Sequence, residues 1–183
     1  MVSASALLGI VLAVELLLAA TPGASVAEST SSPASVAGAA PQTIEDVLTL
    51  KTKIAFDAQS LEFCMRDLEV AIQSLAKGSP FARGGSKQLE IKIIGSDLML
   101  DGITRNMTVR DLNQEGTVAE LLTALARKGN PVGAKAVNDP AQKLVWVIGP
   151  NPDTGKESIL ITTRAAATKK KYTLPTEFQL QGK

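Results

Sequence analysis

The sequence predicts an α+β fold, a small two-layer sandwich in which two helices cover one face of a mixed sheet, in the order β-α-β-β-α-β-β. Three observations lead to this prediction: an apolar stripe at helical spacing over residues 61–75, a second helix with a capping box at residue 117, and short alternating apolar segments between and after them. With 183 residues, 45% of them hydrophobic, the chain is long enough for one modest core.

The first 27 residues contain an apolar run, from about Ala6 to Ala20, and are expected to be a signal peptide or a membrane anchor. Small residues at 25–27 suit signal-peptidase cleavage before Glu28. No Lys or Arg precedes the run, and Glu15 would cost about 2.5 kcal/mol inside a bilayer. A third reading is that Met1 lies inside a longer chain. All three readings place the folded part outside the cytoplasm, in the periplasm or anchored to the membrane.

Three further divisions follow from composition. Residues 28–43 are dominated by Ala, Ser, Pro, Gly and Thr, which offer too little bulky apolar surface to fold, so we expect a disordered linker. Residues 44–178 are expected to form an α+β interaction domain, and residues 179–183 a tail.

The first half of the domain combines one strand, one helix and two further strands. Residues 44–48 suit a short helix or turn, and Ile54, Phe56 and Ala58 alternate as in a strand with one buried face. A helix is predicted next, ended by Gly78 and Pro80; its apolar stripe consists of Leu61, Met65, Leu68, Ile72 and Leu75. Residues 89–93 alternate as a strand that Gly95 stops, and another strand is expected over residues 103–109.

The second half begins with the clearest helix. Thr117 and Glu120 have capping-box spacing, and Gly129 and Pro131 end the helix. Its apolar face consists of Val118, Leu121, Leu122 and Leu125. Two strands are expected after it, over residues 143–149 and 158–164.

Composition excludes several classes of function. The net charge of +1 and the 3% aromatic content argue against nucleic-acid binding, although Lys169–Lys171 is a short basic run. There is no histidine, and the single cysteine, Cys64, is expected to be a packed small hydrophobe. We therefore expect no catalytic residues, no cofactor and no metal site.

The segment "KLVWVIGPNPDTGKESILITTR" resembles the start of a nucleotide-binding phosphate loop. However, five residues separate Gly149 from Gly155 where such a loop has four, and Glu157 stands where a hydroxyl is needed. We interpret this segment as a turn between two strands and expect no nucleotide to bind near Lys156.

Three carboxylates, Asp97, Asp101 and Asp111, lie close in sequence around "GSDLMLDGITRN", which we interpret as a hairpin. Paired carboxylates can perform acid/base chemistry or bind a hard cation. Asp and Gly are also ordinary turn residues, so the sequence favours solvated turn positions.

From Lys53 to Arg164 the chain resembles the STN-like domain, the short domain at the amino terminus of secretins and TonB-dependent transporters. The resemblance is carried by "KIAFDAQSL", "LEVAIQSLAKG", "LEIKIIGSDL", "ITRNMTVRDL" and "TVAELLTALARKGNP", in that order. The chain is also similar to extracytoplasmic modules of bacterial envelope proteins, some of them in planctomycete-like chains. The resemblance implies protein contact in the periplasm rather than catalysis. The loops at residues 79–88 and 130–142 are longer than the family pattern, and no pore or barrel follows.

The leading hypothesis is therefore a non-enzymatic envelope module whose sheet edge or helix face meets an envelope protein. One alternative is the extracytoplasmic sensor domain of a single-pass signalling protein. A further alternative is a carboxylate-based hydrolase that uses Asp97, Asp101 or Asp111.

Overall fold

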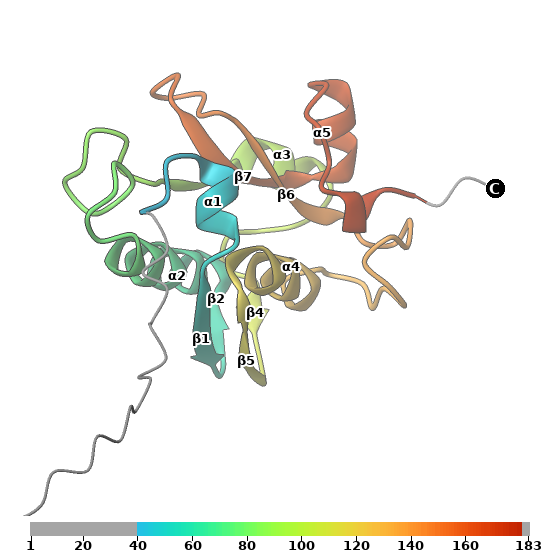
Figure 1. The fold of residues 1–183 in the computed structure, drawn as a ribbon. Helices are drawn as coiled ribbons and strands as arrows, with labels where there is room; N and C mark the ends of the chain where they lie inside the picture. Colours follow the sequence, from blue (N-terminus) through green and yellow to red (C-terminus); the bar gives the residue numbers. More distant parts are fainter. Residues whose placement is uncertain (1–39, 181–183) are drawn as a thin grey trace, which may run out of the picture. The chain divides into compact units, whose positions relative to one another are not determined.

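A three-stranded sheet lies at the centre of the computed structural model, which describes residues 40–180 (Figure 1). The strand order is β3 (Ile91–Ile93), β7 (Glu157–Thr163), β6 (Leu144–Pro150), with β7 parallel to β3 and antiparallel to β6. Every residue of β7 after Glu157 is buried. A strand buried on both faces must be covered on both faces, and helices provide both covers.

The first face of this sheet is covered by the two predicted amphipathic helices, α2 (Leu61–Leu75) and α4 (Val118–Lys128). The Trp146 indole N–H donates to the Thr123 hydroxyl of α4 at 2.9 Å, and side chains of Leu61 and Leu144 both lie against Gly129 at the end of α4. Ser60 caps α2, and Thr117 and Glu120 form the predicted capping box of α4. The α+β class and the two helices on one face are confirmed.

The second face is covered by α3 (Gly95–Leu100) and α5 (Arg164–Lys169), which the sequence did not predict. Ile161 is paired with Trp146, so both side chains lie on the first face and the next residue, Thr162, lies on the second. The Thr162 hydroxyl donates a hydrogen bond to Asp97 of α3 at 2.7 Å. The hairpin predicted around residues 95–106 is therefore wrong. The strand predicted over residues 103–109 is reduced to β4 (Thr108–Val109).

The remaining strands form two separate pairs rather than joining one sheet. β1 (Lys51–Phe56) pairs antiparallel with β5 (Leu112–Thr117), and β2 (Gln59–Ser60) pairs with β4. β5 was not predicted, because "LNQEGT" has one large apolar residue and no alternation. Leu112 is nevertheless buried opposite Phe56, so pairing with β1 holds this polar segment extended.

Two short helices complete the described chain: α1 (Ile44–Leu48), capped by Thr43, and the 3₁₀ helix η1 (Thr176–Phe178). We call residues 172–179 the strap. Tyr172 packs near Leu160 on the second face, whereas Glu177 accepts a hydrogen bond from Thr123 on the first, so the strap passes around the outer edge of β6. Phe178 at its end is fully buried.

Predictions for three single residues, Cys64, Leu75 and Ala58, have different outcomes. Cys64 is fully buried, as predicted, and burial raises the pKa of its thiol to about 11. Leu75, predicted on the buried stripe of α2, is 45% exposed because it is the last residue of the helix. Ala58, predicted in the first strand, lies beyond its end with a φ of 57°.

The expected signal peptide or anchor at residues 1–27 lies outside the described residues, as do most of the expected linker and the last three residues of the expected tail. In residues 40–180, no helix is both long enough and apolar enough to cross a membrane.

The capping box predicts a measurable contribution of Thr117 to stability. Thr117→Ala removes the hydroxyl that accepts from the Glu120 N–H, so the free energy of unfolding should fall by about 1 kcal/mol. Urea unfolding followed by circular dichroism measures this change. Thr104→Ala is the matched control, since the hydroxyl of this exposed threonine makes no hydrogen bond in the described structure. Equal losses for the two variants would contradict the assignment.

Candidate interaction surfaces

The predicted turn around Lys156 is confirmed, since residues 151–156 join β6 to β7. The turn is closed by hydrogen bonds from the Asn151 N–H to the Lys156 carbonyl at 2.7 Å and from the Gly155 N–H to the Asn151 carbonyl at 2.7 Å. Gly155 has a φ of 68°, which suits glycine. The Lys156 side chain lies at the rim of a pocket described below.

The three carboxylates do not converge. Asp97 is 5% exposed and accepts hydrogen bonds from the Thr162 hydroxyl and, at 2.8 Å, from the Lys170 ammonium, so the solvated turn predicted for it is wrong. Asp101 ends α3 and lies 3.7 Å from the Lys143 ammonium. Asp97 and Asp101 line one pocket, whereas Asp111 is exposed between β4 and β5. In the part of the chain that the structure describes, no group of His, Cys, Asp or Glu side chains could hold a metal ion.

The outer edge of β6 carries backbone groups that β7 does not use. The Arg164 N–H donates to the Lys143 carbonyl at one end of the pair, and the Asn151 N–H to the Lys156 carbonyl at the other. Lys143 and Asn151 are both odd-numbered and both continue the β6–β7 register, and hydrogen-bonded pairs alternate along an antiparallel pair. The odd-numbered residues of β6 therefore bond to β7. The N–H and C=O groups of Leu144, Trp146 and Ile148 therefore face away from the sheet.

Both ends of this edge are closed. The Leu144 N–H donates to the Asn130 side chain at 3.1 Å, and the Leu144 carbonyl accepts from the Gln142 side chain at 2.6 Å. Pro150, at the other end, has no N–H to offer. Trp146 and Ile148 remain, and no residue in 40–180 forms a hydrogen bond with their outward backbone groups.

A groove of about 440 Å³ runs beside these two residues. Trp146 and Ile148 form part of the groove floor. Leu48 and Glu45 of α1 form one wall, and residues 173–176 and Gln179 of the strap form the other. The strap makes no backbone hydrogen bond to β6 in the described structure. The unpaired length of the edge is thus short and recessed, since Trp146 is only 3% exposed, and both apolar and polar side chains border it.

The opposite edge of the sheet, along β3, is shorter and partly capped by a carboxylate. Glu69 of α2 accepts a hydrogen bond from the Ile91 N–H at 2.7 Å and another from the Gln73 amide at 3.2 Å. The adjoining pocket of about 200 Å³ is lined mainly by charged side chains of α2 and by Arg105. The pKa of the Glu69 carboxyl is raised, because the effect of burial exceeds the opposite effect of the hydrogen bond from the Ile91 N–H.

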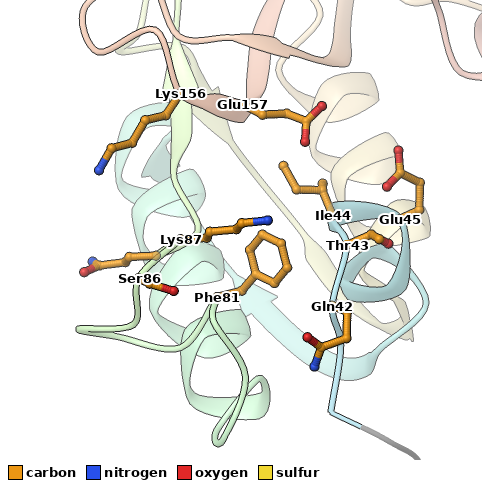
Figure 2. Close-up of a pocket in the computed structure, with 10 residues that line it drawn as sticks. Gln42, Thr43, Ile44, Glu45, Phe81, Ser86, Lys87, Lys156 and Glu157 are labelled. Carbon is orange, nitrogen blue, oxygen red and sulfur yellow. The ribbon is translucent and has the colours of Figure 1, made fainter.

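A further pocket, of about 380 Å³, lies between α1, the loop of residues 79–88 and the start of β7 (Figure 2). Its floor contains the buried Ile44 and Phe81. Lys87 and Lys156 stand on one side of it, and Glu45 and Glu157 on the other. Within residues 40–180 none of these four side chains forms an ion pair or a hydrogen bond. The pocket is therefore dipolar, with uncommitted charges of both signs.

Comparison of the chain with protein-family models, with curated protein sequences and with solved structures finds no match. The similarity to the STN-like domain therefore remains a hypothesis, and function must be argued from the surfaces described above. Sequence reasoning named a sheet edge as a contact surface, but it missed the groove and the dipolar pocket, since both are formed by segments far apart in the chain.

The raised pKa of Glu69 predicts a specific pH dependence of stability. A carboxyl whose pKa is higher in the folded state than in the unfolded state favours folding at low pH, and this contribution is lost as pH rises through the folded-state pKa. The difference in unfolding free energy between the natural protein and Glu69→Gln should therefore grow in favour of the natural protein as pH falls from 7 toward 4.5. Urea unfolding at several pH values measures it, and parallel profiles would refute the expectation.

Proposed function

We propose that the folded part of this chain is a non-enzymatic protein-interaction module of the bacterial envelope, exported or anchored by its N-terminal segment, and that it binds an extended segment of an envelope protein along the free edge of β6. The observation that supports the proposal most directly is the set of backbone N–H and C=O groups of Trp146 and Ile148 that face away from β7 and have no partner in residues 40–180. The apolar run of residues 6–20 and the resemblance to the STN-like domain support the location.

Backbone groups that face a groove without partners favour an incoming strand, because a strand supplies donors and acceptors at the matching spacing. Since Asn130, Gln142 and Pro150 close both ends of the edge, the complementary segment is about three residues long. The groove walls, with Leu48 on one side and Leu174 on the other, favour an apolar side chain in that segment. A single extended peptide fits a recessed edge better than the edge of another complete sheet does.

Other hypotheses receive less support from this geometry. A hydrolase would need a carboxylate pair free of other contacts, whereas Asp97 is bonded to Lys170 and Thr162 and Asp101 lies beside Lys143.

A sensor domain is the second candidate function. It is supported by the dipolar pocket, whose opposed charges suit a zwitterionic ligand such as a free amino acid.

The edge hypothesis predicts the effect of a proline at position 148. Ile148→Pro removes an N–H that faces the groove and leaves the β6–β7 hydrogen bonds intact, so partner binding should weaken about tenfold while the fold is retained. A photo-crosslinking residue at Leu174, on the groove wall, reports binding in the envelope of the producing bacterium, and circular dichroism checks the fold.

Ile148→Ala is the matched control, because it shortens the side chain and keeps the N–H. A crosslinked product that survives in Ile148→Ala and disappears in Ile148→Pro supports strand addition. A product equally strong in both variants, or no product at all, contradicts it.

The sensor alternative predicts binding of free amino acids to the pocket in Figure 2. Isothermal titration with a mixture of amino acids tests this directly. Lys87→Ala and Glu157→Ala should each weaken binding about tenfold by removing one charge partner, whereas Lys77→Ala, a lysine outside the pocket, should not. If titration with the mixture gives no heat of binding, this candidate is eliminated.

A further inference from the structure

The tip of α3 exposes two large apolar side chains. Met99 is 74% exposed and Leu100 is 84% exposed, the highest values among the large hydrophobic residues that the structure describes. They are the last two residues of the helix, and Gly102, with a φ of 72°, turns the chain two residues after Leu100. These two adjacent side chains form an exposed apolar patch, and such patches mark protein or membrane interaction sites when polar residues surround them.

Lysines surround this apolar tip. Lys169 and Lys170 line the same pocket as Leu100, and Lys143 reaches Asp101, the residue after Leu100. We call Met99, Leu100, Lys143, Lys169 and Lys170 the α3 patch. All three lysines come from elements next to the second face of the sheet, where Figure 1 places α3 and α5.

The acidic groups of this region are already engaged. Asp97 accepts from Lys170 at 2.8 Å, and Asp101 lies 3.7 Å from Lys143. Lys169 has no ion pair within residues 40–180, and the exposed Lys171 follows two residues later. The region therefore has a net positive charge around an apolar centre.

We propose that the α3 patch is a membrane-contact surface that places Met99 and Leu100 at the headgroup boundary of an anionic bilayer, with the surrounding lysines at the lipid phosphates. Lysine stems can lie along apolar surface while their ammonium groups reach a polar layer, so both features of the patch are used at once. Anionic headgroups match the charge of Lys169, which has no ion pair in the described residues. This inference does not depend on the β6 edge.

A second copy of the chain is a poorer occupant of the patch. A twofold contact would bring the lysines of one copy against the same lysines of the other, and like charges oppose each other in such a contact. A bilayer contact at this patch is expected to be weak, but an N-terminal anchor would hold the domain at a high effective concentration near the lipid.

Site-specific fluorescence on the full chain tests the proposal. Leu100→Cys is labelled with an environment-sensitive fluorophore; the buried Cys64, whose thiol pKa is raised, does not compete at neutral pH. Val70→Cys is the matched control, because Val70 is 48% exposed on α2, which covers the other face of the sheet. The probes are vesicles of phosphatidylcholine alone or mixed with phosphatidylglycerol.

The expected result is a blue shift and increased intensity at position 100 only with phosphatidylglycerol, lost in about 1 M salt, where the Debye length is about 3 Å. The label at position 70 should not respond, even if the N-terminal segment inserts. Lys169→Gln should raise the lipid concentration at half-maximal signal about fivefold, and Lys77→Gln should leave it unchanged.

Three outcomes would overturn the proposal. The label at position 100 could give no response to either vesicle, or the same response to both, or a response that depends on protein concentration without vesicles, as expected if a second copy covers the patch. None of these outcomes bears on the β6 edge, so failure here is distinct from failure of the proposed function.

Discussion

The burial of β7 on both faces is the constraint from which the rest of the domain follows. All six residues of "SILITT" are buried, so both faces of this strand are covered by other elements. α2 and α4 cover one face, α3 and α5 cover the other, and β3 and β6 take the two edges. Both polar contacts that mark the faces, Trp146 to Thr123 and Thr162 to Asp97, satisfy groups that this burial would otherwise leave without partners.

The same constraint explains why the candidate surfaces lie at the edges. In a three-stranded sheet, the central strand uses all its backbone groups, whereas each edge strand uses half of its own. The chain closes part of the remaining half with side chains: Asn130 and Gln142 at Leu144, and Glu69 at Ile91. The strap borders the edge of β6 as one wall of the groove and makes no hydrogen bond to its backbone, so the outward backbone groups of Trp146 and Ile148 stay unpaired in the described residues.

Local signals in the sequence were sufficient where one element determines its own structure. Thr117, Glu120 and Gly129 define the start and end of α4, and the stripe from Leu61 to Ile72 identifies α2. Residues 95–100 were interpreted as part of a hairpin because Gly and Asp favour turns. The helix α3 is instead stabilised by packing against β7, where Asp97 bonds to Thr162, 65 residues away in the sequence. β5 was missed for a similar reason, since its extended form depends on pairing with β1.

The role of Asp97 shows how far the candidate sites could be predicted. Sequence alone groups it with Asp101 and Asp111, because all three lie within 15 residues of one another. In the fold, Asp97 instead joins α3 to Thr162 of β7 and to Lys170 at the end of α5, so it ties together the elements that cover the second face. This arrangement holds the C-terminal end of α3, with Met99 and Leu100, against a fixed part of the domain. An exposed apolar pair on a helix that is already ordered loses side-chain but little backbone freedom on contact, which favours a binding role for the α3 tip.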